Sequence, residues 1–457
     1  MKQTIQPPFP GSVLTIPSGL TVTLVELVQQ YPGKRFIFRG LLANGSCVAV
    51  KLYAGTLGQT WEWWKGVRGA EALARTEIAA PRLLYSGYSN ETKTWMSLLE
   101  WIAPDDDWPP HTAALEPGEH MRFIRTIASH HQAGITQGDT NWNNFVPRDG
   151  LLYVVDTDRI RSHNAPLNRR QSLRHLVRIY SSKSKIPEDQ VGWAYRVYIQ
   201  QRGWRFFEKE ERRFLSKIAK SRVRHAAAVS RRSLNGWKHY AQTALGGVEI
   251  LYDRRSASSV DIAEMVQGFR ESAVSTTSLS LDGRSFNVKP CTGQPESRRP
   301  LADVLLLGRK AISRNWVTAL TLRRLGFPIE RPVALLKDRK REMGWLVTDV
   351  SNAIPLRSSL PGSRQEGNDA ALSAIRNLLA LMRRHGIVNT RWSLDTLGWD
   401  GERIWLLDIA GIDFHPAYLP GFDRRWTRGL DQLADSLAAH LGASAGNVRL
   451  SLDPSAA

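Results

Sequence analysis

The chain has 457 residues, a net charge of +19 and two cysteines. This length is enough for two domains with separate cores, and two cysteines are too few for a disulfide framework. No run approaches the ~18 consecutive apolar residues that a membrane-spanning helix needs. Because residues 1–19 also lack a charged segment followed by an apolar one, we expect no secretory signal and a reducing cytoplasmic location.

The first predicted element is a β-hairpin over residues 35–53. Its apolar strands flank Asn44-Gly45, a dipeptide that favours a type I′ turn. Lys51 ends the run VAVK, the pattern of the kinase strand whose lysine contacts the α- and β-phosphates of a nucleotide. The hairpin therefore predicts a nucleotide-binding lysine at position 51.

A glycine-rich phosphate loop is not evident before this hairpin. Gly33 and Gly40 are the only candidates for such a loop. The phosphate-covering segment is therefore expected to be atypical, with Lys34 or Arg35 contributing positive charge.

Residues 61–76, WEWWKGVRGAEALART, are predicted to form a helix. Glu71 is the expected ion-pair partner that orients Lys51, and Glu62 and Glu77 are the alternatives.

The segment MSLLEWI, at residues 96–102, fits a connector between two lobes. We expect the backbone at Glu100 and Ile102 to bind the adenine of ATP.

Residues 134–161, GITQGDTNWNNFVPRDGLLYVVDTDRIR, are predicted to form a polar loop followed by an apolar strand that ends at an aspartate. Phosphoryl transfer needs a carboxylate that takes the proton of the attacking hydroxyl, and an Asn and a second Asp that hold Mg2+. Asp139, Asn144 and Asp156 have the order and spacing for these roles. The alternative is a solvated turn between two strands, because Asn, Asp and Gly are ordinary turn residues.

The same pattern occurs again in the second half of the chain. Residues 386–413, GIVNTRWSLDTLGWDGERIWLLDIAGID, align with residues 134–161 without a gap. Asp282-Gly283 precedes Lys289 as Asn44-Gly45 precedes Lys51, and Pro332 aligns with Pro81. The repeat predicts two similar units in tandem.

The second unit is predicted to have lost its chemistry. Arg391 replaces Asp139 and cannot act as a base, because a guanidinium stays protonated. Thr396 replaces Asn144, and the helix before residue 326 offers no acidic partner for Lys289. Lys289 and Asp408 are therefore interpreted as inherited residues without a function.

Basic residues cluster over residues 208–240. This cluster fits a solvated helical face and linker, or a surface that contacts anionic membrane or lipid A-core phosphates. We expect no nucleic-acid partner, because the chain carries no nucleic-acid-binding motif.

On these motifs the first half resembles bacterial lipopolysaccharide core kinases, which phosphorylate Kdo or heptose of the inner core. The carrying residues are VAVK around Lys51, the loop GDTNWNN with Asp139 and Asn144, and VVDTDR. The D-x-D-R ending, from Asp156 to Arg159, replaces DFG and is characteristic of that family. The segments 168–182 and 312–336 resemble its basic helix and its αC region. One departure is Gln137, where the family usually has His.

The resemblance implies an α+β chain of two tandem protein-kinase-like bilobal domains, catalytic over 1–228 and degenerate over 229–457. It implies an ATP- and Mg2+-dependent kinase at the inner face of the inner membrane. The acceptor would be a heptose or Kdo of the lipopolysaccharide core oligosaccharide or lipid A precursor. Asp139 would be the base, and Asn144, Asp156 and Asp158 would form the metal site, with Asp158 and Arg159 also bracing the metal loop.

Two alternatives remain open at this point. One is a non-catalytic scaffold or binding protein for lipopolysaccharide assembly. The other is a kinase for another small molecule or for protein, because the residues that select the acceptor are not recognisable.

Overall fold

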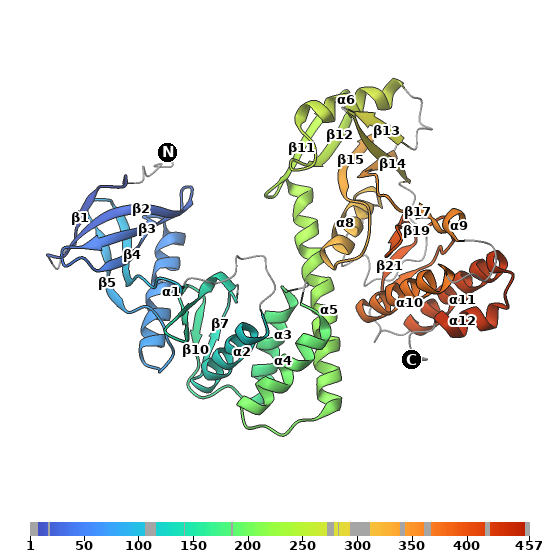
Figure 1. Ribbon diagram of the computed structural model, residues 1–457. Helices are drawn as coiled ribbons and strands as arrows, with labels where there is room; N and C mark the ends of the chain where they lie inside the picture. The colour runs from blue at the N-terminus through green and yellow to red at the C-terminus, as the bar shows by residue number, and fades with distance from the viewer. Residues whose placement is uncertain are drawn as a thin grey trace. The chain divides into compact units, whose positions relative to one another are not determined.

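The protein has a mixed α+β fold, seen here in a computed structural model (Figure 1). The structure describes residues 8–16, 19–105, 116–140, 142–183, 186–271, 278–281, 283–292, 311–338, 343–360, 367–415 and 421–452. The chain divides into two compact units: Met1–Ile179 with Ile186–Arg212, and Tyr180–Lys185 with Arg213–Ala457. The predicted limit between residues 228 and 229 falls inside one long helix, α5 (Glu208–Arg232), so the division lies earlier in the chain than expected.

The first unit begins with an antiparallel sheet of six strands in the order β1-β2-β3-β4-β6-β5. The strands are β1 (Val13–Thr15), β2 (Thr21–Tyr31), β3 (Arg35–Leu42), β4 (Cys47–Ala54), β5 (Leu83–Ser89) and β6 (Thr94–Glu100). Val48, Val50 and Leu52 of β4 point into a core with Phe38. Because side chains alternate along a strand, Lys51 lies on the opposite face of β4.

The turn between β3 and β4 differs from the predicted type I′ turn. Type I′ needs positive φ at both central residues. Gly45 has φ of 81°, but Asn44 is not among the positive-φ residues, and the Gly45 N–H donates to the Leu42 carbonyl at 2.9 Å. The hairpin therefore uses an ordinary turn followed by a left-handed glycine.

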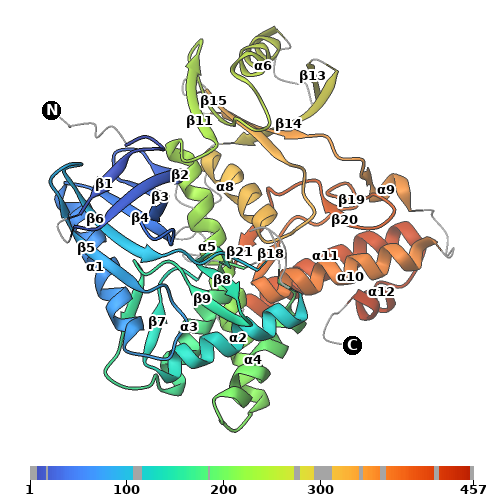
Figure 2. The same ribbon diagram turned by 60° about the vertical axis from the view of Figure 1, so that its left-hand side comes forward.

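Helices and short hairpins make up the rest of the first unit (Figures 1 and 2). The helices are α1 (Leu57–Ala74), α2 (Pro117–Gln132), α3 (Arg169–Ser181) and α4 (Glu188–Gln201), with the 3-10 turn η1 (Trp142–Asn144). The short strands are β7 (Ile135–Gln137), β8 (Phe145–Arg148), β9 (Leu151–Val154) and β10 (Ile160–Ser162). Strand β7 pairs with β10 and β8 pairs with β9, which brings the two ends of the polar loop together.

The second unit also has a six-stranded antiparallel sheet, in the order β11-β12-β15-β16-β14-β13. Its strands are β11 (Tyr240–Leu245), β12 (Val248–Asp253), β13 (Ser278–Leu281), β14 (Arg284–Thr292), β15 (Pro332–Asp338) and β16 (Met343–Asp349). Helix α6 (Ser259–Glu271) lies near β13, and α8 (Ala311–Arg324) lies against β14, β15 and β16.

A mainly helical part follows this sheet, with α10 and α11 side by side in both views (Figures 1 and 2). Its helices are α9 (Leu356–Ser359), α10 (Gly367–His385), α11 (Phe422–Leu441) and α12 (Ala445–Leu452). Its short strands are β17 (Ile354–Pro355), β18 (Ile387–Asn389), β19 (Leu397–Trp399), β20 (Ile404–Leu406) and β21 (Ile412–Phe414). The 3-10 turn η2 (Ser233–Asn235) links α5 to β11.

The two aligned sequence segments form the same strand pairs at the same register. Ile160 pairs with Gln137, and their aligned positions Ile412 and Asn389 pair in the second unit. Three of the four residue pairs of the hairpin β8–β9 likewise have their aligned counterparts in β19–β20. Asp282, which the repeat relates to Asn44, lies outside the described residues.

Candidate functional site

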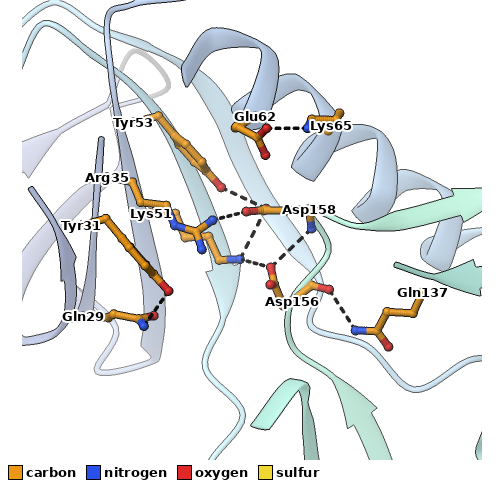
Figure 3. A network of polar contacts seen from close by, with 10 residues as sticks. All are labelled: Gln29, Tyr31, Arg35, Lys51, Tyr53, Glu62, Lys65, Gln137, Asp156 and Asp158. Atoms are coloured by element: carbon orange, nitrogen blue, oxygen red, sulfur yellow. Dashed lines mark hydrogen bonds and ion pairs between the residues drawn. The ribbon is translucent and has the colours of Figure 1, made fainter. Parts of the chain in front are cut away.

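The centre of the candidate site is the ammonium group of Lys51, which is 6% exposed. Its Nζ lies 3.3 Å from Asp156 Oδ1 and 3.8 Å from Asp158 Oδ1 (Figure 3). Burial alone lowers the pKa of Lys51, but Asp158 and Asp156 outweigh it and the pKa is raised. The structure thus brings the predicted lysine together with both carboxylates of the D-x-D turn.

Asp158 is the most enclosed residue of this group, with 3% of its side chain exposed. Arg35 donates to its Oδ2, and the Tyr53 hydroxyl donates to its Oδ1 at 3.1 Å (Figure 3). Tyr53 reaches it because residues 51 and 53 share one face of β4. Both Asp158 oxygens are therefore engaged by protein groups, which suits an anchor for Lys51 and Arg35.

Magnesium is coordinated by oxygen atoms, usually one or two carboxylates plus the phosphates of a substrate. Asp156 fits this role, since its side chain is 22% exposed and its Oδ2 makes no hydrogen bond among the described residues. Asp158 does not fit, because Arg35, Tyr53 and Lys51 already surround it. The expected role of Asp158 as a metal ligand is thus replaced by the bracing role. Among the described residues, no three His, Cys, Asp or Glu side chains form a metal cluster.

Helix α1 approaches the D-x-D turn closely enough to require glycine. A Cβ atom at Gly66 would lie 2.7 Å from Asp158 Oδ1, and one at Gly69 would lie 2.1 Å from the Thr157 carbonyl oxygen. Real Cβ contacts are not this short, so only glycine permits the packing. The two glycines bring the helix backbone directly against the turn that holds Asp156 and Asp158.

The expected ion pair between Lys51 and Glu71 is not formed, so that prediction is wrong for this structure. Glu71 is exposed, because α1 buries the face that carries Gly66, Gly69 and Leu73. Glu62, one of the weighed alternatives, lies one turn before Gly66 but pairs with Lys65 Nζ at 2.6 Å (Figure 3). The carboxylates that hold Lys51 come from the D-x-D turn instead.

The polar loop is held together by its own asparagine. Asn144 Nδ2 donates to the Asp139 carbonyl oxygen at 2.8 Å, and the Asn144 carbonyl accepts from the Val155 N–H at 3.0 Å. The second bond ties the loop to the residue before Asp156. The Asp139 side chain is exposed.

A buried chain of hydrogen bonds ends at this loop. The Gln137 carbonyl can only accept, so His175 Nε2 donates to it at 2.7 Å. For neutral rings, His131 Nε2 then donates to His175 Nδ1 at 2.7 Å, and Tyr198 donates to His131 Nδ1 at 2.7 Å. Arg202 donates to the Tyr198 hydroxyl at 2.9 Å.

The rings in this chain are neutral because burial disfavours the charged form. Burial and nearby positive groups lower the pKa of His131 to about 2, and they also lower the pKa of His175. The side-chain amide of Gln137 donates toward the Asp156 carbonyl at 3.5 Å (Figure 3). The chain of histidines thus supports the backbone just before Asp139.

The predicted connector lies at the end of β6. The Glu100 N–H donates to the Arg82 carbonyl at 2.9 Å, and its half-exposed side chain lies 3.6 Å from Arg148. Ile102 is buried, and its backbone makes no hydrogen bond to another described residue. Of the two predicted adenine contacts, Ile102 therefore has the backbone group available to a ligand.

In the second unit the aligned lysine has a different partner. Lys289 donates to the buried carboxylate of Glu330 and, at 2.5 Å, to the Leu407 carbonyl. Glu330 also accepts from Asn287 at 2.6 Å and from Thr348 at 2.8 Å. The expectation that Lys289 lacks an acidic partner is wrong, because Glu330 comes from the segment after the helix.

In the second unit the side chains of Thr396 and Asp408 form hydrogen bonds with nearby backbone groups. The Thr396 hydroxyl donates to the Ser393 carbonyl at 2.8 Å, and Asp408 Oδ1 accepts from the Ala410 N–H at 2.9 Å. Arg391 occupies the position of Asp139. Lys289 is thus bound to Glu330 and not to Asp408.

Sequence reasoning missed the ion pair of Arg35 with Asp158 and the role of Tyr53. Arg35 was expected only to add charge near phosphates. The glycine pair in α1 was the one local signal that could have shown a close contact there, because glycine is unfavourable inside a helix.

The basic cluster lies mostly on helix α5, and its members differ in accessibility. Lys217 and Arg224 are exposed. Arg222 is 8% exposed and donates to the Tyr180 carbonyl at 3.2 Å and to the Lys183 carbonyl at 2.9 Å. Arg222 is therefore a structural residue and is not available to an anionic surface.

No protein-family model matches the chain, and no curated protein is significantly similar to it. Within the described part of the chain, no helix is both long and apolar enough to cross a bilayer.

Proposed function

We propose that the first unit is a protein-kinase-like phosphotransferase that uses ATP and Mg2+. The observation that carries the proposal is the buried contact of Lys51 Nζ with Asp156 Oδ1 at 3.3 Å. A lysine on a sheet strand that faces the acid after a second hairpin is the arrangement by which kinases hold phosphates and metal. The order of these residues along the chain supports the same reading.

In this proposal each residue of the first unit has a separate role. Asp139 takes the proton of the acceptor hydroxyl, and Lys51 binds the α- and β-phosphates. Asn144 and Asp156 hold Mg2+, which neutralises the charge of the phosphates when it is bound. Asp158 keeps Lys51 and Arg35 in place.

The acceptor is proposed from the resemblance to lipopolysaccharide core kinases. The exposed Asp139 is accessible to a large acceptor such as a heptose or Kdo of the core oligosaccharide. The chain would work in the cytoplasm, bound to the inner face of the inner membrane through exposed basic residues of α5. Both halves would be kinase-like and bilobal, the second without catalysis.

A non-catalytic scaffold is the second candidate, and the contact of Lys289 with Glu330 favours it for the second unit. Lys289 is held by Glu330, and in the described part of the chain it makes no ion pair with Asp408 of the kind that Lys51 makes with Asp156. The two candidates differ in turnover, because a scaffold would bind ATP without transferring its phosphate.

The test is transfer of labelled γ-phosphate from Mg2+-ATP to purified core oligosaccharide that lacks phosphate. We expect one phosphate to be added to a heptose or Kdo, as located by mass spectrometry and NMR. Tight Mg2+-ATP binding without transfer to the core, to other sugars or to protein would contradict the proposal and favour the scaffold.

A further inference from the structure

The second unit contains a basic cavity of about 940 Å³, apart from the position of Lys289. It is lined by α5, the β11–β12 hairpin and the end of α8. Among the described lining residues, seven are Arg or Lys and one, Asp253, is acidic. Six of these seven side chains could contact a bound anion: Arg232, Lys238, Arg255, Arg323, Arg324 and Arg331.

Asp253, the single acidic residue among the described lining residues, is already paired with arginine. Asp253 accepts from Arg255 at 2.9 Å and 2.6 Å, and it lies 3.9 Å from Arg331. Arg323 and Arg324 form no ion pair with any described residue, and the Nε atom of Arg324 is buried without a hydrogen-bond partner. The described lining of the cavity therefore carries a clear excess of positive over negative charge.

The cationic groups of the cavity are close enough to affect one another's pKa values. Burial and the nearby Arg331 lower the pKa of Arg323. Burial, Arg324 and Arg232 lower the pKa of His225, which also lines the cavity. Like charges held together raise the free energy of the folded state, and a bound anion relieves that repulsion.

We propose that this cavity binds a ligand with two or more closely spaced phosphoryl groups. Arginine guanidinium groups bind phosphate oxygens in pairs, and their arrangement around one cavity suits more than one phosphate. The volume is within the usual range for small-molecule sites. The Trp237 ring, which makes cation–π contacts with Arg232 and Lys238, offers an apolar surface for the sugar or base of such a ligand.

The phosphoryl groups could belong to a nucleotide or to a phosphorylated sugar. The inference stands apart from the proposed phosphotransfer, because it concerns only residues of the second unit. Either proposal can fail while the other holds.

The test uses the full chain with ¹³C-labelled histidine, and sodium pyrophosphate as the probe. The His225 signal is assigned with His225→Gln and titrated with pH. Because a bound anion favours the imidazolium, we expect pyrophosphate to raise the pKa of His225, with affinity that falls as salt rises. An unchanged His225 titration at low salt would overturn the proposal.

A pair of matched variants locates the binding. Arg323→Gln/Arg324→Gln should weaken pyrophosphate binding by about tenfold or more, since two charge-assisted contacts are lost. Arg424→Gln/Arg428→Gln removes the same charge from exposed positions of α11 and should change it less than about twofold. Equal loss in both variants would reduce the effect to net charge and contradict a built site.

Two further experiments control for loss of folding and identify the source of the phosphoryl groups. If Arg323→Gln/Arg324→Gln fails to fold, Arg232→Gln/Lys238→Gln replaces it with the same expected loss. Competition by ADP and by 5-phosphoribosyl 1-pyrophosphate, which both carry two adjacent phosphoryl groups, distinguishes a nucleotide from a phosphorylated sugar, because the ligand that resembles the natural one more closely displaces pyrophosphate at the lower concentration. Failure of both to displace pyrophosphate would contradict the proposal.

Discussion

Lys289 of the second unit donates to Glu330, whereas the aligned Lys51 of the first unit faces Asp156 and Asp158. The first unit has Ala79 at the position of Glu330. Each lysine is thus neutralised by acids from a different part of its unit. This difference means that equivalent substitutions in the two units should have different effects.

Asp139→Asn should lower phosphoryl transfer by about 10²-fold or more, the usual scale for loss of a general base. Nucleotide affinity should be retained, because Lys51 and Asp156 are untouched. Asp149→Asn is the matched control: it removes an exposed carboxylate at a left-handed position that Asn tolerates. Steady-state kinetics with purified protein measure both. Equal turnover of Asp139→Asn and wild type would exclude Asp139 as the base.

Lys51→Met should abolish activity, while Lys289→Met should leave kcat near that of the wild type. Removing Lys289 leaves Glu330 buried without its cation, so the free energy of unfolding should fall by roughly 1–3 kcal/mol. Glu330→Gln in the same chain should restore part of that loss, since Asn287 and Thr348 still reach position 330. Activity and urea unfolding are measured on the same samples. Loss of turnover in folded Lys289→Met would show that the second unit takes part in the reaction.

Gly66→Ala and Gly69→Ala should each destabilise the first unit by roughly 1–3 kcal/mol, because the new methyl group overlaps the Thr157-Asp158 turn. Gly58→Ala lies in the same helix with nothing within 4 Å of its Cβ position, and it should stabilise by ~0.5–1 kcal/mol. Urea unfolding of the three variants gives the comparison. A neutral effect at Gly69 would mean that the helix is not in contact with the turn.

Stability should fall as pH drops below the ordinary histidine pKa of about 6.5, because the buried rings stay neutral while the unfolded chain takes up protons. Burial lowers the pKa of His131 to about 2 and that of His130 to about 3, so their contribution is full above pH 6.5 and is lost progressively below it. Each ring contributes roughly 1 kcal/mol per pH unit. Unfolding free energies at pH 7, 6 and 5 should fall less steeply for His131→Gln. Parallel slopes for the variant and the wild type would contradict this assignment.

Anionic vesicles should bind the chain with an affinity that falls as salt rises, because each basic residue near such a surface gains about 1 kcal/mol that salt screens. Lys217→Glu/Arg224→Glu should weaken sedimentation with vesicles more than Arg424→Glu/Arg428→Glu, the control on another exposed helix. Arg222 is left unchanged because it holds backbone carbonyls. If vesicle binding changes neither with salt nor in either variant, the result would favour a kinase that does not use a basic surface to bind membranes.

The α+β character, the hairpin with Lys51 and the acid-ended strand could be predicted from the sequence, because they depend on local pattern. The approach of Lys51 to Asp156 followed from their order in the chain and a known arrangement. Arg35 with Asp158 could not be predicted, since residues far apart in the sequence meet there without a local signature.

Glu71 illustrates the opposite error. Spacing from Lys51 suggested it, but the face that a helix buries depends on its packing, and glycines at 66 and 69 turn Glu71 outward. The alternative Glu62 lies on the inward side yet pairs within its own helix.

The two six-stranded sheets extend from opposite sides of their lysine strands. In the first unit β1, β2 and β3 lie on one side of β4, whereas in the second unit only β13 lies on the corresponding side of β14 and β12 and β11 extend the other edge. As a result β5 is the last strand of the described sheet of the first unit, while its counterpart β15 pairs with β12. In the second unit the β11–β12 hairpin that extends this edge also lines part of the basic cavity, so that cavity depends on two strands for which the described sheet of the first unit has no counterpart.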